Sequence, residues 1–159
     1  MSEVIVVSSE TVTIHAPAEL VWQVIVDFSS YAEWNEFCPS IDAELVMGAP
    51  VKMQVNLGSG LQEQVEYITC IDAPTKITWS MENKPGDPIH ADRSQVVTAV
   101  DGEHCTYVTY DEFSGEFAAT MVEQLGEQVR AGFNLCARNL KQRAPVHLIA
   151  QPLSQQIHR

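Results

Sequence analysis

The chain has 159 residues, 45% of them hydrophobic and 19% charged, which is typical of one globular domain and unlike a disordered or fibrous protein. Its net charge of −12, with only nine Lys and Arg, argues against nucleic-acid binding, because phosphate contacts need clustered basic side chains. No apolar run approaches the roughly 18 residues of a membrane-spanning helix, and residues 1–51 lack the basic residues of a targeting peptide, so we expect a cytoplasmic protein with no membrane span.

The N-terminal part predicts one strand followed by two short helices. Residues 4–14 are mostly apolar and β-branched, with Ser and Thr interleaved, as in a strand. Pro17 suits the first position of a helix, and apolar residues recur at helical spacing through 20–28. Residues 30–33, Ser-Tyr-Ala-Glu, have the form of a capping box, so a second short helix through Trp34 is expected.

The central part changes to alternating apolar and polar residues, which predicts β-strands. Turns rich in Gly and Pro divide it into six strands, with expected ranges 41–46, 51–57, 61–71, 76–82, 89–100 and 103–113. The connections are too short for parallel crossovers, and Asp101-Gly102 favours a two-residue hairpin turn. The sheet is therefore expected to be antiparallel.

The C-terminal part predicts one long helix over residues 117–142, which contain no proline and carry an apolar stripe. Gly126 and Gly132 lie inside it, where each costs about 1 kcal/mol relative to Ala, so we expect a close approach or free volume there. Residues 1–144 form one predicted domain, and 145–159, which show no periodicity, a C-terminal tail. The predicted fold is α+β, with a seven-stranded antiparallel sheet, two short helices after the first strand and the long C-terminal helix.

Several segments of the chain resemble the SRPBCC superfamily. These segments are His15–Trp22, Asp27–Asn35, Ile77–Trp79, Phe113–Gly115, Gly132–Asn134 and Asn139–Arg143. The resemblance covers residues 5–144. Within the superfamily, the chain resembles the polyketide cyclase/dehydrase-like and coenzyme Q-binding-protein-like members. The resemblance implies a START-like, helix-grip fold, in which the sheet curves around the C-terminal helix and a mainly apolar cavity between them holds a small hydrophobic molecule.

Large side chains on the expected inner faces are the candidate ligand-binding residues. Strand alternation and the helical stripe place six of them toward the cavity, namely Trp34, Tyr67, Trp79, Met121, Leu125 and Phe133. Ordinary core packing accounts for the same residue types, because pocket walls and cores share their chemistry.

Asp92 is the best candidate for a catalytic group and is also expected to contact the ligand, with Tyr67 or Ser94 as its hydrogen-bonding partner. A carboxylate on an inner face must pair or undergo a rise in pKa, and a raised pKa suits a general acid or base. The alternative is that Asp92 pairs with Arg93 or lies at the solvent rim. Where many SRPBCC relatives have His and an aromatic residue, this chain has Asp92 and Ser94, which implies a more polar pocket.

Two functions are compatible with these features. The first is binding or transport of a small hydrophobic ligand, such as a lipid, a quinone or a polyketide-like molecule. The second is a polyketide cyclase/dehydrase-type enzyme, in which Asp92, Tyr67 or Arg93 moves protons on a ligand held in the same cavity. Neither the four cysteines nor the five histidines show metal-ligand spacing, and nucleotide-binding glycine motifs are absent, so no metal and no cofactor is expected.

Overall fold

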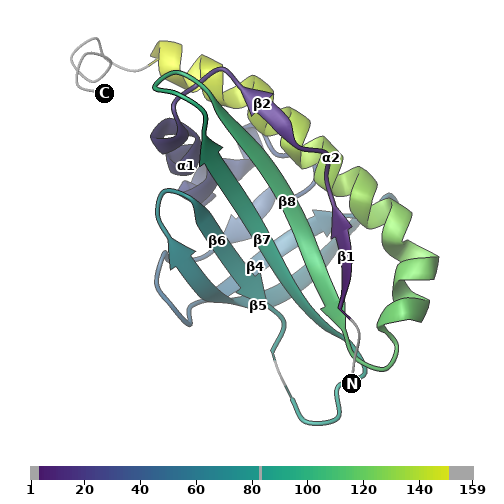
Figure 1. Cartoon of the computed structure of the whole chain (residues 1–159). Helices are drawn as coiled ribbons and strands as arrows, with labels where there is room; N and C mark the ends of the chain where they lie inside the picture. The colour runs from purple at the N-terminus through teal and green to yellow at the C-terminus, as the bar shows by residue number, and fades with distance from the viewer. Residues whose placement is uncertain (1–3, 83, 151–159) are drawn as a thin grey trace.

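A computed structural model describes residues 4–82 and 84–150 (Figure 1). The elements follow the predicted order, and the predicted α+β class is confirmed. In chain order they are β1 Ile5–Ser8, β2 Val12–Ile14, α1 Ala18–Val26, the 3₁₀ helix η1 Phe28–Glu33, β3 Ser40–Asp42, β4 Pro50–Asn56, β5 Leu61–Asp72, β6 Lys76–Ser80, β7 His90–Ala99, β8 Cys105–Ser114 and α2 Ala118–Ala150.

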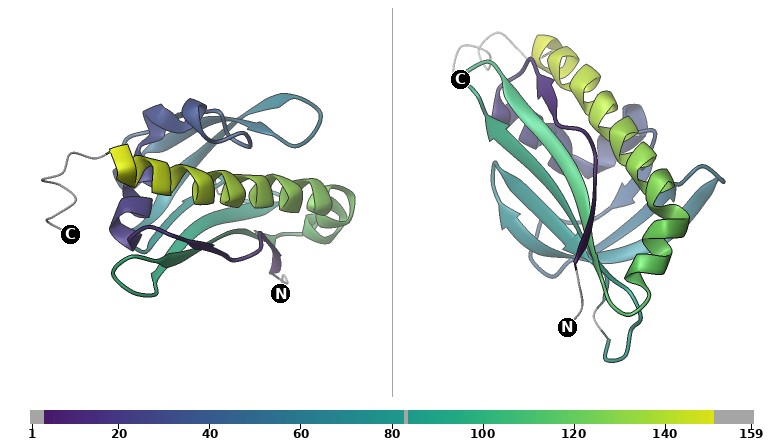
Figure 2. Two further views of the ribbon diagram at one scale, coloured as in Figure 1. Left: turned by 90° about the horizontal axis from the view of Figure 1, so that it is seen from above. Right: turned by 45° about the vertical axis from the view of Figure 1, so that its right-hand side comes forward.

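The strands form one antiparallel sheet that curves around α2. Neighbouring strands follow the order β1-β8-β7-β6-β5-β4-β3, and β2 also pairs with β8. Figure 2 shows α2 lying between the β4–β5 hairpin and the β7–β8 hairpin, on the concave side of the sheet. The hydrophobic core fills much of the space between α2 and this concave face, so the sheet has one inner and one outer face.

The predicted first strand is divided into β1 and β2, so the sheet has eight strands rather than seven. Ser8 pairs with Tyr110 and Val12 with Tyr107. Moving four residues along the chain from β1 to β2 therefore corresponds to moving only three residues along β8. The extra residue forms a bulge, which the sequence alternation did not reveal. There the hydroxyl of Ser9 accepts a hydrogen bond of 3.1 Å from the backbone of β8.

A second irregularity lies in β5, between Ile68 and Cys70. Ile68 pairs with Trp79 and Cys70 with Thr78, so Thr69 is an additional residue on the β5 side. Because successive side chains of a strand point to opposite faces, the bulge changes which residues face inward.

The predicted second helix is the 3₁₀ helix η1, and its predicted capping box is not formed. Ser30 lies within η1 rather than at its N-terminus, and its hydroxyl donates to Asp27 Oδ2 at 2.8 Å. Glu33 accepts a hydrogen bond of 2.7 Å from Arg143 Nη2. The two side chains therefore stabilise the connection before η1 and its packing on α2.

The long helix α2 continues to Ala150, beyond the predicted end at Gln142. Pro145 lies inside it, where a proline removes one backbone hydrogen bond. The adjacent Ala144 is fully buried, so packing holds this turn in place. The remainder of the predicted tail, 151–159, lies outside the described residues. Within the described ranges, no helix combines the length and apolar character needed to cross a membrane.

The two glycines of α2 have different surroundings. A Cβ atom added at Gly132 would overlap the ring of Phe37, so Gly132 marks a close approach of the kind expected from the sequence. A Cβ atom at Gly126 would meet Cγ1 of Val122, one turn earlier in the same helix, at 3.1 Å. Val122 is only partly buried and has room to adjust.

Substituting these glycines is therefore expected to have opposite effects on stability. Gly132→Ala should lower the free energy of unfolding by roughly 1–3 kcal/mol through overpacking against Phe37. Gly126→Ala should raise it by about 0.5–1 kcal/mol, because Ala is the better helix former. Urea denaturation of both variants checks this, and stabilisation by Gly132→Ala would contradict the close approach.

Candidate functional site

A cavity of about 450 Å³ lies between the inner face of the sheet and α2. This volume falls within the usual range of small-molecule sites, about 300–1,000 Å³. Four residues at helical spacing supply the α2 wall, and alternate residues of β4 to β8 supply the opposite wall. The apolar lining includes Phe37, Met53, Val55, Trp79, Ala91, Phe113, Met121, Leu125, Val129 and Phe133.

The cavity reaches the surface beside the first turns of α2. Leu125 and Val65 both line it, yet these residues are 40% and 42% exposed. Deeper in the cavity, Trp79 and Phe133 are each only 1% exposed. The site is therefore a pocket with an apolar rim and a buried interior.

Four of the predicted ligand-binding residues lie together at this cavity. Trp79 comes from β6, and Met121, Leu125 and Phe133 come from α2. The alternation of Ile77 and Trp79 and the stripe of α2 placed them correctly, because both patterns are set by burial. Contact of these four side chains with a ligand remains a prediction.

Trp34 was expected at the cavity but does not line it. It follows η1, and its ring packs edge to face with Tyr31 at a centroid distance of 5.0 Å. Trp34 instead borders a separate surface pocket that includes Asn139 and Arg143 of α2. Because the second helix is a 3₁₀ turn, its end directs Trp34 toward the C-terminal half of α2.

Tyr67 and Asp92 lie on the outer face of the sheet, so the expectation that they face the cavity is wrong. Tyr67 and Asp92 both pair with Ser80, and the adjacent residue Trp79 faces inward. Tyr67 and Asp92 therefore share a face, as predicted, but it is the opposite one. They border an open depression of about 760 Å³, which is larger than the cavity but is not enclosed between the sheet and α2.

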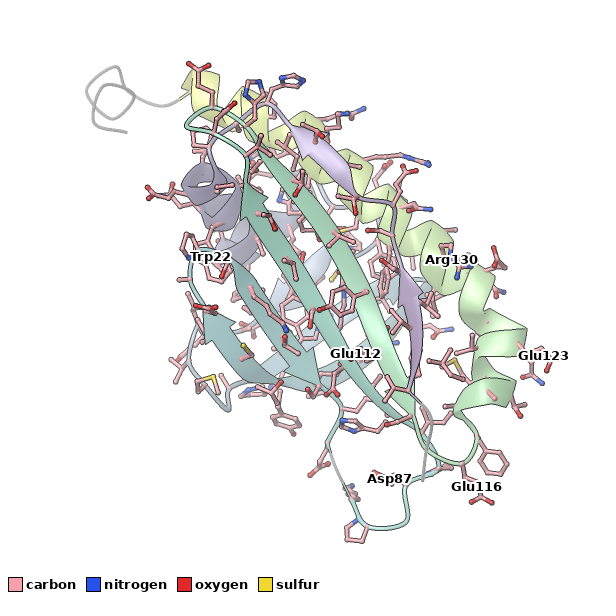
Figure 3. All side chains as sticks on the ribbon, viewed as in Figure 1. Trp22, Asp87, Glu112, Glu116, Glu123 and Arg130 are labelled. Atoms are coloured by element: carbon pink, nitrogen blue, oxygen red, sulfur yellow. The ribbon has the colours of Figure 1, made fainter. Side chains whose placement is uncertain are left out.

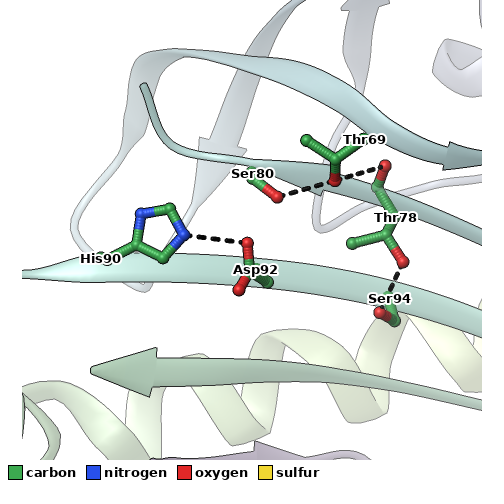
Figure 4. Close-up of polar contacts among 6 residues, drawn as sticks. All are labelled: Thr69, Thr78, Ser80, His90, Asp92 and Ser94. Carbon is green, nitrogen blue, oxygen red and sulfur yellow. Dashed lines mark hydrogen bonds and ion pairs between the residues drawn. The ribbon is translucent and has the colours of Figure 1, made fainter. Parts of the chain in front are cut away.

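Asp92 pairs with a neighbouring histidine near the surface (Figure 4). His90 Nε2 lies 3.0 Å from Asp92 Oδ1, and 38% of the Asp92 side chain is exposed. Ser94, the other expected partner, shares a hydrogen bond of 2.8 Å with Thr78. Glu112 of β8 lies on the same outer side (Figure 3). Asp92 thus corresponds to the solvent-rim alternative rather than to a group in the cavity.

The charged side chains that line the cavity are Glu66 of β5, Arg93 of β7 and Asp111 of β8. Arg93 pairs in register with Trp79 on one side and with Asp111 on the other. Arg93 was named only as a secondary candidate from the sequence, and the two carboxyl groups were not recognised. The cavity therefore contains a polar group of residues within an apolar wall.

Arg93 is only 6% exposed and lies among aromatic rings. Its guanidinium carbon lies 4.6 Å from the ring centroid of Phe133, 5.3 Å from that of Phe37 and 5.6 Å from that of Trp79. These distances are within the range of cation–π attraction. The rings therefore hold the guanidinium in one position at the cavity wall.

Two polar contacts complete the surroundings of Arg93. Its Nε donates to Thr109 Oγ1 at 3.1 Å, and its Nη2 lies 3.8 Å from Cys136 Sγ. Burial by itself lowers the pKa of Arg93, but the acidic groups of Cys136, Tyr107 and Asp111 outweigh this and the net pKa is raised. The side chain is therefore positively charged at every accessible pH.

Both carboxyl groups of the cavity have raised pKa values. Burial, followed by the negative charge of Asp111, raises the pKa of Glu66 to about 8, and Arg93 acts in the opposite sense. Burial likewise raises the pKa of Asp111 to about 6, against the effect of Arg93. Near pH 7, Glu66 is therefore mostly protonated, whereas Asp111 is mostly ionised.

Cross-strand charge is the feature of the sequence that could have identified Arg93 and Asp111. The predicted two-residue turn at Asp101-Gly102 would pair Asp92 with Asp111, and like charges directly opposite are unfavourable. In the structure the connection between β7 and β8 is longer, and Arg93 pairs with Asp111. A shift of one residue between β7 and β8 thus replaces a pair of like charges with the oppositely charged pair Arg93 and Asp111. Both of these residues lie on the inner face of the sheet.

The chain matches the model of the family described as "Polyketide cyclase / dehydrase and lipid transport" over residues 6–144. None of the curated proteins is similar enough in sequence to count as a match.

Several solved structures have a similar fold. An aromatase/cyclase from Streptomyces sp. R1128 is 20% identical, with a TM-score of 0.70 over 93% of this chain and 98% of that one. A START superfamily protein from Mycobacterium smegmatis is 15% identical, with a TM-score of 0.67 over 89% and 98%. Norcoclaurine synthase from Thalictrum flavum is 12% identical, with a TM-score of 0.67 over 96% and 90%. At these identities the similarity shows the START-like, helix-grip fold alone.

Proposed function

Because the chain belongs to the polyketide cyclase / dehydrase and lipid transport family, we propose that it binds a small hydrophobic molecule between its sheet and α2. The observation that carries the proposal is the mainly apolar cavity of about 450 Å³. A lipid, a quinone or a polyketide-like molecule would bury apolar surface there, which contributes about 25 cal/mol per Å². The exposed Leu125 at the rim gives such a molecule a route of entry.

Filling the cavity from the sheet is expected to prevent this binding. Ala91 lines the cavity and is 6% exposed, so Ala91→Phe would place a ring in the space of the ligand. We expect affinity for the uncharged fluorescent probe N-phenyl-1-naphthylamine to fall at least about tenfold, which corresponds to about 1.4 kcal/mol. A fluorescence titration of wild type and variant measures this.

Thr98→Phe is the matched control, because Thr98 lies on the same strand, is exposed and does not line the cavity. This variant should bind the probe with wild-type affinity. Thermal unfolding of both variants separates loss of the site from loss of the fold. Equal probe affinity in wild type and a folded Ala91→Phe variant would overturn the proposed cavity function.

A second candidate function is a cyclase/dehydrase-type enzyme acting in the same cavity. It is favoured by the raised pKa of Asp111, because buried carboxyl groups with raised pKa values are suited to proton transfer. Two of the proteins with similar folds, the aromatase/cyclase and norcoclaurine synthase, are enzymes by name. In this case Asp111 and Glu66 replace Asp92 and Tyr67 as the candidate proton-transfer groups.

A further inference from the structure

Glu66 has an unsatisfied oxygen in the wall of the cavity. The side chain lines the cavity from β5, and its Oε1 atom is buried without a hydrogen-bond partner among the described residues. A buried polar atom normally has a partner, because leaving one unpaired costs roughly 1–3 kcal/mol. The missing partner therefore points to a group that enters the cavity from outside the chain.

Arg93 does not supply this partner. Its guanidinium is engaged by Thr109, Cys136 and the surrounding aromatic rings. Among the described residues, no ion pair within 4.0 Å joins Arg93 to Glu66 or Asp111. The carboxyl group of Glu66 is thus left free to interact with a bound molecule.

The charges around Glu66 favour an uncharged molecule. Arg93 of β7 and Asp111 of β8 face it inside the cavity, and Asp92 acts on it from the outer face. The residues that line the cavity from β4, β6 and α2 are uncharged. Near pH 7 the charges of Arg93 and Asp111 cancel while Glu66 is mostly protonated, so an added anion or cation would be left unbalanced in a buried site.

We propose that Glu66 determines the specificity of the cavity by donating a hydrogen bond from its neutral carboxyl group to a carbonyl, hydroxyl or ether oxygen of an uncharged, otherwise apolar ligand. This inference rests on the proposed binding function and goes beyond it, since an apolar cavity alone would accept hydrocarbons and oxygenated molecules alike. The charge balance around Glu66 also disfavours fatty acids and amines of the same size, because these molecules carry a charge. Glu66 is in this sense a specificity-determining residue, whether or not the bound molecule is then transformed.

Four naphthalene probes of matched shape test the proposal. They are 2-acetylnaphthalene, 2-ethylnaphthalene, 2-naphthoate and 2-(aminomethyl)naphthalene, with affinities measured by isothermal titration calorimetry at pH 6.5 and pH 9.5. At pH 6.5 we expect the ketone to bind up to about tenfold more tightly than the ethyl compound, as one hydrogen bond allows. At pH 9.5 the carboxyl group is ionised, so the preference should disappear while ethyl-compound binding is unchanged.

Variants of Glu66 separate the hydrogen bond from its pH dependence. Glu66→Leu should abolish the preference for the ketone at both pH values. Glu66→Gln keeps an N–H donor that does not titrate, so its preference should persist at pH 9.5. Glu63→Gln is the matched control, because Glu63 is exposed on the same strand and should behave as wild type.

The outcomes distinguish the two levels of the inference. If at pH 6.5 the ethyl compound binds but the ketone shows no advantage, or if a charged probe binds most tightly at that pH, the role of Glu66 is wrong and the cavity function stands. The same holds if Glu66→Gln retains the wild-type pH dependence. If none of the four probes binds to the folded protein, the proposed function fails, and the role of Glu66 fails with it.

Discussion

Replacing Glu66 with Gln is expected to raise the free energy of unfolding by roughly 2–4 kcal/mol at pH 9 and to change it little at pH 4. The pKa of this carboxyl rises from 4.5 to about 8 on folding. The folded protein therefore binds more protons than the unfolded chain between these values, and wild-type stability falls as pH rises through this window. Gln cannot ionise, so the variant should escape this loss.

Urea denaturation at a series of pH values measures the difference. Glu63→Gln, at an exposed position of the same strand, should reproduce the wild-type profile. Parallel profiles for wild type and Glu66→Gln would show that Glu66 is not held in its protonated form by the fold. The amide of Gln needs partners of its own, and this is why the expected gain is smaller than the full shift of the pKa implies.

Arg93→Met is expected to destabilise the protein by roughly 2–4 kcal/mol at pH 7.5, because it leaves ionised Asp111 buried without a nearby positive charge. Met retains much of the packing against Phe37, Trp79 and Phe133. At pH 4, Asp111 and Glu66 are both protonated in the folded state, since their pKa values are about 6 and about 8. The loss there should fall to about 1 kcal/mol or less.

Chemical denaturation of wild type and Arg93→Met at the two pH values tests this expectation. A pH-dependent difference identifies charge as the contribution of Arg93. An equal loss at both pH values would instead assign the effect to packing and to the contacts with Thr109 and Cys136. Arg138→Met provides a control, because Arg138 is largely exposed and pairs with Glu10 on the surface.

The fold could be predicted from the sequence because burial sets most of its patterns. The stripe of α2 and the alternation around Trp79 are apolar on the side that faces the core. The features that were missed are backbone irregularities. The bulge at Ser9 depends on a backbone hydrogen bond to Thr109 of β8, and η1 is held by short-range backbone hydrogen bonds such as that from Trp34 to Tyr31, and neither leaves a clear trace in local composition.

The cavity site was harder to predict, because its polar lining reverses the usual pattern of a half-buried strand. On the N-terminal part of β5, Leu61 is exposed and Val65 is exposed at the cavity rim, while the polar residues Gln62, Gln64 and Glu66 line the cavity. The more apolar face was therefore assigned inward, and Tyr67 with it. On β7, Asp92 and Ser94 are the positions that match the SRPBCC pattern when counted back from Gly102, whereas in the structure Arg93 faces inward among aromatic rings.

The additional residue in β5 has a consequence for insertions and deletions in this strand. Glu66 and Ile68 face inward before the bulge, and Ile71, which packs against the core, follows after it. Deleting Thr69 would restore simple alternation and leave Ile71 on the inner face and Cys70 on the outer face, because Thr69 is the residue that the bulge accommodates. A homologous chain can therefore lose one residue at the bulge without exchanging its core-facing and solvent-facing side chains, whereas the loss of one residue elsewhere in β5 would exchange them over the rest of the strand.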